Sequence, residues 1–216
     1  MEPRLRIHEI YRSLQGETRQ SGRPCTFVRL TGCDLRCHWC DTPQAFVGGR
    51  WWSLDEIVAE VERLGAPFVT VTGGEPLLQA ESCAALVARL LDAGHDVQVE
   101  TGGHRDVSVL DRRARIICDL KAPGSGESDK IDWDNLDRLR ADDEIKIVVA
   151  SREDFDWAVA RIDERLGELP ATTTLQPATG TLEPVTLADW MLERPALPAR
   201  FGLQLHALLW PGQEQR

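Results

Sequence analysis

The stretch Cys33-Asp-Leu-Arg-Cys37-His-Trp-Cys40 places three cysteines within eight residues. Three thiolates on one short loop can bind three irons of a 4Fe-4S cluster, and they leave the fourth iron without a protein ligand. Such clusters are normally held by four cysteines, so this loop leaves one coordination position for another molecule. We therefore expect a 4Fe-4S cluster bound by Cys33, Cys37 and Cys40.

Two simpler sites could use the same cysteines. A structural zinc site could recruit His38, but such sites usually contain two separated ligand pairs, and no second Cys-x2-Cys or His-x3-His follows. A disulfide with a spare thiol requires an oxidising compartment, whereas the start of the chain, Met1-Glu-Pro-Arg, shows no apolar signal segment. The cysteine spacing therefore favours the cluster, and the start of the chain favours a cytoplasmic location. A zinc-stabilised binding protein is the non-enzymatic alternative.

The composition argues against several classes of partner. The chain has 216 residues and a formal net charge of −10, which disfavours nucleic acid because phosphate recognition needs a basic surface. No stretch approaches the ~20 apolar residues needed to cross a membrane. We expect a single domain over residues 1–216 that acts on a small molecule.

Apolar and β-branched runs alternate with helical patterns along the chain. Strands are predicted at 25–31, 68–72, 96–100, 115–119, 145–149, 172–176 and 201–205. Helices are predicted at 53–65, 77–93, 152–167 and 186–194, and loops at 48–52 and 123–127. The first helix begins with a capping box, Ser53-Leu-Asp-Glu56, and stops at Gly65. This alternation predicts an α/β fold with a parallel sheet flanked by helices.

Polar or glycine-rich segments follow nearly every predicted strand. The cysteine loop follows the first strand, and the later strands are followed by Thr72-Gly-Gly-Glu-Pro76, Glu100-Thr-Gly102, Asp119-Leu-Lys121, Gln176-Pro177 and His206. Because the carboxyl ends of parallel strands face one side of a barrel-like sheet, we expect these segments to form one active site.

The cysteine motif together with Thr72-Gly73-Gly74-Glu75-Pro76 resembles the radical S-adenosylmethionine superfamily. Three further stretches, Ser13-Leu-Gln-Gly-Glu17, Cys40-Asp41-Thr42 and Leu203-Gln-Leu-His206, resemble the 7-carboxy-7-deazaguanine synthases. This second resemblance extends from about Ile10 to Pro211, and it implies a partial, trimmed TIM-like barrel of parallel strands with flanking helices.

The resemblance implies a reaction. S-adenosylmethionine would bind the open iron and, on receiving one electron, give a 5′-deoxyadenosyl radical. This radical would abstract hydrogen from C6 of the substrate, 6-carboxy-5,6,7,8-tetrahydropterin. Ring contraction with loss of ammonia would then yield 7-carboxy-7-deazaguanine, an intermediate of 7-deazapurine (queuosine) biosynthesis. S-adenosylmethionine would be regenerated. A magnesium ion, a reductant such as a flavodoxin or ferredoxin, and a homodimer are also implied. A glycyl-radical-enzyme activase is the alternative enzyme, but it would lack the pterin-matching stretch 13–17.

The resemblance also assigns the substrate contacts. Glu17 would bind the guanidine-like edge of the pterin, because a carboxylate can accept two N–H donors. Arg29 lies between Val28 and Leu30 on its strand, so its side chain points to the face of the sheet opposite theirs. If that face is the barrel interior, the Arg29 guanidinium would pair with the substrate carboxylate. Glu100 would manage protons at the ring nitrogens if burial raises its pKa. The alternatives are a solvated turn residue for Glu17 and a structural carboxylate for Glu100. The remaining substrate contacts would be Leu14, Gln15, Gly16, Thr72 and His206.

The cofactor and metal contacts complete the implied site. Glycines at 73 and 74 would let backbone carbonyls approach the methionine amino group. The hydroxyl of Thr42 would bind magnesium, which needs few protein ligands; without the resemblance, Thr42 is a turn residue before Pro43. The S-adenosylmethionine contacts would be Gly74, Asp119, Leu120, Lys121, Gln176, Pro177, Ala178 and Thr179.

Two positions depart from the family pattern. A contact from a C-terminal proline carboxylate does not transfer, because Gly212-Gln-Glu-Gln-Arg216 follows Pro211. Residues 212–216 are polar and unpatterned, which predicts a flexible tail. Asp119 stands where some members carry a small polar residue.

Overall fold

The computed structural model describes residues 3–213, and its centre is a nine-stranded sheet within that range. The strands are β1 (Arg4–Leu14), β2 (Pro24–Leu30), β3 (Arg50–Ser53), β4 (Phe68–Gly73), β5 (Asp96–Thr101), β6 (Arg115–Leu120), β7 (Glu144–Val149), β8 (Thr172–Pro177) and β9 (Ala199–Phe201). Their order is β3-β1-β2-β4-β5-β6-β7-β8-β9.

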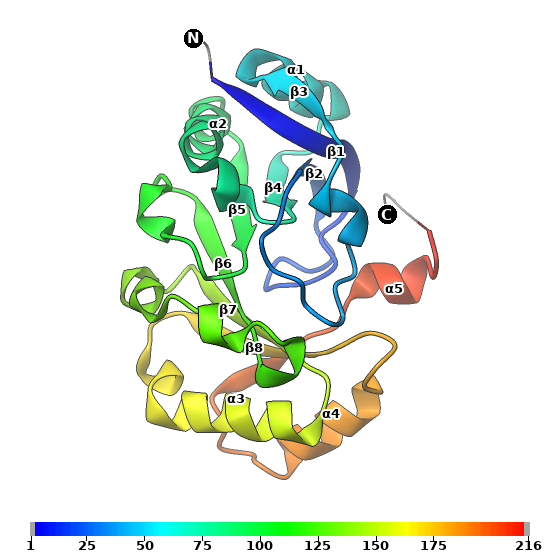
Figure 1. Ribbon diagram of the computed structural model, residues 1–216, viewed down its shortest axis with the longest axis vertical. Coiled ribbons are helices and arrows are strands. Elements are labelled where there is room, and N and C mark those ends of the chain that lie inside the picture. Colours follow the sequence, from blue (N-terminus) through cyan, green and yellow to red (C-terminus); the bar gives the residue numbers. More distant parts are fainter. Residues whose placement is uncertain (1–2, 214–216) are drawn as a thin grey trace.

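The sheet is mostly parallel. Every neighbouring pair from β2 to β9 is parallel, whereas β1 runs antiparallel to both β2 and β3. The outermost strands, β3 and β9, do not pair with each other, so the barrel stays open (Figure 1). This confirms the predicted α/β fold, a partial TIM-like barrel.

The helices are α1 (Leu54–Leu64), α2 (Ala80–Asp92), α3 (Arg152–Glu164), α4 (Pro184–Leu192) and α5 (Leu205–Leu209). The first four lie along the outside of the sheet, and α5 lies on the side where the barrel is open (Figure 1). None of the helices in the described range is long and apolar enough to cross a membrane.

Alternation along the strands separates the core from the barrel interior. In β7, Ile145, Ile147 and Val149 are fully buried in the cluster that also contains Phe155 and Ile162 of α3. The residues between them face the other way, because successive side chains of a strand point to opposite faces. The barrel interior is therefore free to carry polar groups.

The first predicted helix begins and ends as its sequence indicates. The Ser53 hydroxyl accepts a hydrogen bond from the Glu56 amide at 3.2 Å, and the Glu56 carboxylate accepts one from the Ser53 amide at 2.7 Å. Gly65 ends the helix in the left-handed region, with φ +72°, a conformation that favours glycine.

Six of the predicted strands are confirmed within about two residues, but the seventh is wrong. The segment predicted as a strand at 201–205 is split between the end of β9 and the start of α5, because the chain leaves the sheet at Gly202. The predicted loop at 48–52 is also wrong, since Arg50–Ser53 forms β3 against β1. β1 itself was not predicted: it mixes charged and apolar residues and is only partly covered by other elements.

Candidate active site

A cavity of about 310 Å³ opens at the carboxyl ends of the parallel strands. The predicted site residues that line it are Leu14, Gln15, Gly16, Glu17, Arg29, Cys33, Cys37, Cys40, Thr42, Thr72, Gly74, Glu100, Asp119, Lys121, Gln176, Ala178, Thr179 and His206. Leu120 and Pro177 are absent from the lining. Each is buried and adjoins a lining residue, so strand alternation turns its side chain away from the cavity.

The three cysteines of the loop after β2 gather at one end of this cavity. All three are partly exposed and free, and the Cys37 thiol interacts electrostatically with both others. Burial raises the pKa of each thiol, and the Lys121 ammonium opposes that shift at all three. A cation shared by three thiols suits a site that must bind them as thiolates.

The loop has the donor set of an iron-sulfur cluster rather than of a single ion. Within residues 3–213, no three His, Cys, Asp or Glu side chains converge closely enough to hold one metal ion. A 4Fe-4S cluster does not need such convergence, because each thiolate binds a different iron. The residues present therefore fit the expected cluster.

Glycines connect β4 to the cysteine loop. A Cβ on Gly74 would lie 2.7 Å from the Cys33 Cβ, and one on Gly73 would lie 2.5 Å from the Leu30 carbonyl oxygen. Side chains at these positions would push the loop away from β4. Close packing of the cysteine loop against β4 thus requires glycine at both positions. This adds to the expected approach of the backbone carbonyls to the methionine amino group.

Glu75, in the same motif, is a structural carboxylate that the sequence interpretation did not assign. It is fully buried and accepts hydrogen bonds from the Leu77 amide (2.9 Å), the Gly102 amide (2.8 Å) and the Thr101 hydroxyl (2.9 Å). These bonds fix the end of β5, which carries Glu100, against the end of β4.

Glu100 lies deep in the cavity and accepts three side-chain hydrogen bonds. The donors are Gln15 Nε2 at 3.0 Å, Gln98 Nε2 at 3.1 Å and the Thr72 hydroxyl at 3.2 Å. Burial raises the pKa of Glu100, although Lys146 opposes the shift. The raised pKa meets the condition stated for a proton-managing role.

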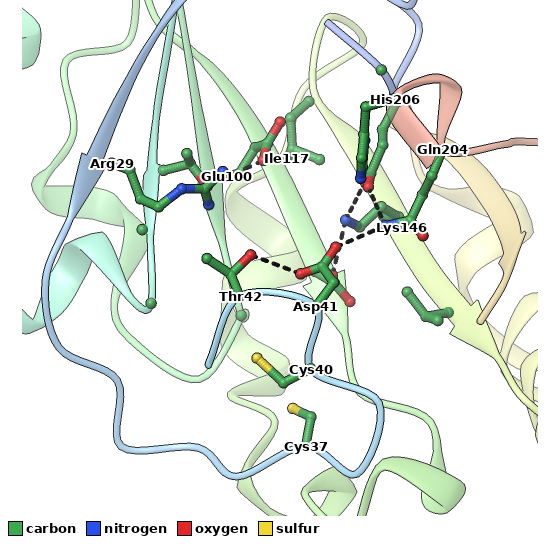
Figure 2. Close-up of a pocket in the computed structure, with 18 of the residues that line it drawn as sticks. Arg29, Cys37, Cys40, Asp41, Thr42, Glu100, Ile117, Lys146, Gln204 and His206 are labelled. Carbon is green, nitrogen blue, oxygen red and sulfur yellow. Dashed lines mark hydrogen bonds and ion pairs between the residues drawn. The ribbon is translucent and has the colours of Figure 1, made fainter. Parts of the chain in front are cut away.

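Arg29 faces the barrel interior, as its predicted alternation required. Its Nε donates to Glu9 Oε1 at 2.8 Å, and its Nη2 donates to the Tyr11 hydroxyl at 3.2 Å. Burial lowers the pKa of Arg29, but Tyr11 and Glu9 outweigh that effect and raise it. The guanidinium is therefore a fixed cation at the cavity wall (Figure 2).

A second charged group forms around Lys146. Its Nζ lies 2.6 Å from Glu17 Oε2 and 3.1 Å from Asp119 Oδ2. Burial acts to raise the pKa of Glu17, but the Lys146 ammonium outweighs it and the net shift is downward. Glu17 is therefore an ionised acceptor inside the cavity, which excludes the solvated-turn alternative.

Gln204 and Thr42 frame the cavity near the cysteine loop (Figure 2). Gln204 Nε2 donates to Glu17 Oε1 and to Asp41 Oδ2, both at 2.8 Å. The Thr42 hydroxyl donates to Asp41 Oδ1 at 2.8 Å. Since that bond uses the hydroxyl proton, the Thr42 oxygen keeps its lone pairs for a cation, which fits the expected magnesium site.

His206 lines the cavity from α5, not from the end of a strand as predicted. A Cβ on Gly16 would lie 3.1 Å from His206 Nδ1, and the Leu205 amide donates to the Gly16 carbonyl at 2.9 Å. α5 therefore packs on the loop that carries Glu17. Gln213, in the predicted tail, also lines the cavity, whereas residues 214–216 lie outside the described range.

Gln176 provides an unused hydrogen-bonding group on the expected cofactor side. It is 1 % exposed, lines the cavity, and its Oε1 has no hydrogen-bond partner. A buried acceptor of this kind suits the amino group of an adenine. The residues at the end of β8 therefore fit S-adenosylmethionine.

Several cavity residues were missed by sequence reasoning. Lys146 stands between Ile145 and Ile147 in the apolar run 145–149 that was predicted as a strand, and the single charge in that run was the available signal. Two of the others, Asp41 and Gln204, lie in the stretches that carry the family resemblance but were given no role, and Glu9 and Tyr11 carried no comparable signal.

Comparison with known proteins gives consistent results. Residues 27–124 match the Radical SAM superfamily. The chain is 42% identical to a 7-carboxy-7-deazaguanine synthase of Koribacter versatilis over 95% of this chain and 97% of that protein. It is 43% identical to one of Chlorobaculum tepidum, over 97% of this chain and 96% of that protein. The crystal structure of QueE from Escherichia coli is similar, with a TM-score of 0.72 and 26% identity, covering 94% of this chain and 95% of that chain.

Proposed function

The chain belongs to the 7-carboxy-7-deazaguanine synthase family of radical S-adenosylmethionine enzymes, and from this membership we propose how its cavity performs the family reaction. The reaction converts 6-carboxy-5,6,7,8-tetrahydropterin to 7-carboxy-7-deazaguanine with loss of ammonia, a step of queuosine biosynthesis. One observation carries the residue assignment: the three-cysteine loop and the polar groups Glu17, Arg29 and Glu100 line the same cavity.

The cofactors bind at the cysteine end of the cavity. Cys33, Cys37 and Cys40 hold the 4Fe-4S cluster. S-adenosylmethionine contacts Gly74, Asp119 and Lys121, the backbone at Leu120, and the segment 176–179. When bound, these two groups supply the carbon-centred radical that starts the reaction. The chain keeps both at one end of the cavity that the substrate-binding groups also line.

The substrate binds between the two charged groups of the cavity. The ionised Glu17 accepts N–H donors of the pterin's guanidine-like edge, and the fixed guanidinium of Arg29 pairs with the carboxylate. Leu14, Gln15, Gly16, Thr72 and His206 complete its surroundings. These contacts hold C6 in one orientation, as hydrogen abstraction at a single carbon requires.

Glu100 manages protons at the ring nitrogens. Its raised pKa lets it retain a proton closer to neutral pH than an ordinary carboxyl group does. Gln15, Gln98 and Thr72 hold its two oxygens in place. Glu100 can therefore give a proton to the departing nitrogen, which leaves as ammonia, and its carboxylate can then accept a proton from another ring nitrogen without changing position.

Thr42 would hold the expected magnesium ion through its hydroxyl, and the ion would supply positive charge for the substrate carboxylate. Supporting this, the Thr42 hydroxyl lines the cavity and donates its proton to Asp41. Replacing Thr42 with Ala removes one inner-sphere oxygen, so a higher magnesium concentration should be needed for half-maximal turnover. Titration of turnover with magnesium checks this, and an unchanged profile would make Thr42 only a turn residue.

The proposed partners are a small reductant, such as a flavodoxin or ferredoxin, and a second copy of the chain. The partly exposed cysteines support local docking of the reductant. The exposed apolar residues Val185 and Leu192 on α4, with Phe201 at the sheet edge, support a homodimer. The free thiols and cluster suit the reducing cytoplasm.

Anaerobic reconstitution with iron and sulfide tests the function. The expected result is a brown protein that forms 7-carboxy-7-deazaguanine from the pterin when S-adenosylmethionine and a reductant are present. A colourless, zinc-containing protein would support the binding-protein alternative. A brown protein that cleaves S-adenosylmethionine but leaves the pterin unchanged would favour an activase-like enzyme.

A further inference from the structure

We propose that Lys146 is a positioning residue, the common counter-ion of Glu17 and Asp119, which holds the substrate side and the cofactor side of the cavity at a fixed separation. The inference rests on the proposed function, which assigns those two carboxylates to different ligands. Nothing in the sequence motifs points to Lys146.

The sheet itself places Lys146 beside Asp119. The two residues are register partners in the parallel pair β6 and β7, and neighbouring strands lie about 4.8 Å apart. Ile145 and Ile147 are buried in the core on the opposite face of β7, so the Lys146 side chain points into the cavity (Figure 2). Its ammonium can then reach the Asp119 carboxylate, at 3.1 Å.

The second carboxylate comes from a distant part of the chain. Glu17 lies in the loop between β1 and β2, and its Oε2 is 2.6 Å from Lys146 Nζ. Glu144, two residues earlier on the same face of β7, accepts a hydrogen bond from the Arg19 amide at 2.7 Å. Two successive interior residues of β7, Glu144 and Lys146, therefore hold this loop. Lys146 binds Glu17, the residue proposed to bind the pterin.

The two carboxylates depend on Lys146 to different degrees. Asp119 also lies 3.2 Å from the ammonium of Lys121. Among the ion pairs of residues 3–213, Glu17 has Lys146 as its only cation. The side chains of Lys146, Glu17 and Asp119 are 11%, 12% and 14% exposed, so solvent compensates little for a lost partner. Loss of Lys146 should therefore impair the pterin site more than the cofactor site.

Binding measurements on reconstituted protein test the proposal. We would compare the parent with Lys146→Met, Glu17→Gln, the double variant, and the control Arg194→Met, an exposed arginine paired with the exposed Asp163. The dissociation constants of 6-carboxy-5,6,7,8-tetrahydropterin and of S-adenosylmethionine are measured separately, together with iron content and Tm.

We expect Lys146→Met to weaken pterin binding about tenfold or more and S-adenosylmethionine binding by a smaller factor, with iron content unchanged. In the double variant, pterin binding should be no more than about threefold weaker than in Glu17→Gln alone, because residues that act through each other are not additive. The control should match the parent in every measurement.

Two results would overturn the proposal: pterin binding in Lys146→Met within about twofold of the parent, or fully additive losses in the double variant. If Lys146→Met does not fold, the double variant decides, since it also removes the unpaired Glu17 carboxylate. A double variant that folds and binds pterin like Glu17→Gln supports the proposal, and one that does not fold contradicts it. A parent protein that binds S-adenosylmethionine but no pterin would instead contradict the proposed function.

Discussion

Single cysteines in this chain differ in environment, and their substitution should have different consequences. Cys37 lies in the cavity with Cys33 and Cys40, whereas Cys83 is fully buried in the core. We expect Cys37→Ala to lose the cluster and all turnover, and Cys83→Ala to keep both, since Cys83 acts there as a small apolar residue. Iron content and visible absorbance check this; a Cys37→Ala protein with full iron and turnover would contradict the cluster assignment.

Replacing Glu100 with Gln should raise the stability of the protein and lower its activity. Burial raises the pKa of the folded protein's Glu100 above its unfolded value, so its stabilising contribution is complete below the unfolded pKa and is lost as pH rises through the folded pKa. Glu100→Gln resembles the protonated form and does not titrate. We therefore expect its Tm advantage over the parent to grow with pH and then level off, while kcat falls about 100-fold or more.

Thermal unfolding of ligand-free Glu100→Gln and parent protein between pH 5 and pH 8 checks the stability half of this prediction, and turnover at one pH checks the other. A Tm difference that does not vary with pH would show that Glu100 has an ordinary pKa. Unchanged turnover would leave it with a structural role alone.

At the scale of elements, α5 closes one wall of the cavity by packing on the loop that carries Glu17. His206 lies on α5 and lines the cavity. We expect His206→Ala to weaken pterin binding by about 1–3 kcal/mol, because it removes a hydrogen-bonding partner in an enclosed site. Direct measurement of the pterin dissociation constant checks this.

The segment after α5 provides the matching control. Removing residues 212–216 leaves α5 whole and, of the two described residues in that segment, takes Gln213 from the cavity lining. Turnover of the truncated protein should stay within a few-fold of the parent. If truncation abolishes turnover while His206→Ala has no effect, the assignment of the C-terminal segment is wrong.

At the scale of the whole molecule, the open barrel holds a cavity lined by the cysteine loop and by strands β1, β2, β4, β5, β6, β7 and β8. A ligand that bridges these parts should stabilise all of them together. At a concentration about 100 times its dissociation constant, S-adenosylmethionine should add about 2.7 kcal/mol. For a domain of this size that corresponds to a Tm increase of about 5–10 °C.

Thermal unfolding of the reconstituted protein under anaerobic conditions measures this increase. Cys37→Ala, which lacks the open iron, should show a much smaller one. Equal increases in both proteins would mean that S-adenosylmethionine binds independently of the cluster.

The sequence by itself determined the strand–helix alternation, the cysteine loop and the strand-end segments that line the cavity, whereas the roles of Leu14 to Glu17, Arg29 and Thr42 came from the family resemblance. These features are local: apolar periodicity, caps such as Ser53 and Gly65, and motifs at strand ends each leave a signal within a few residues. Parallel strands place their carboxyl ends together, so residues at those ends could be assigned to one site before any contact was known.

Only the tertiary structure decided how β1, β3 and α5 are placed and which charges meet inside the barrel. β1 and β3 form through pairing with distant strands, and His206 reaches the cavity because α5 packs on the loop at Gly16. Lys146 and Glu17 are 129 residues apart in the chain. Contacts between such distant residues depend on register and packing, which local sequence patterns do not encode.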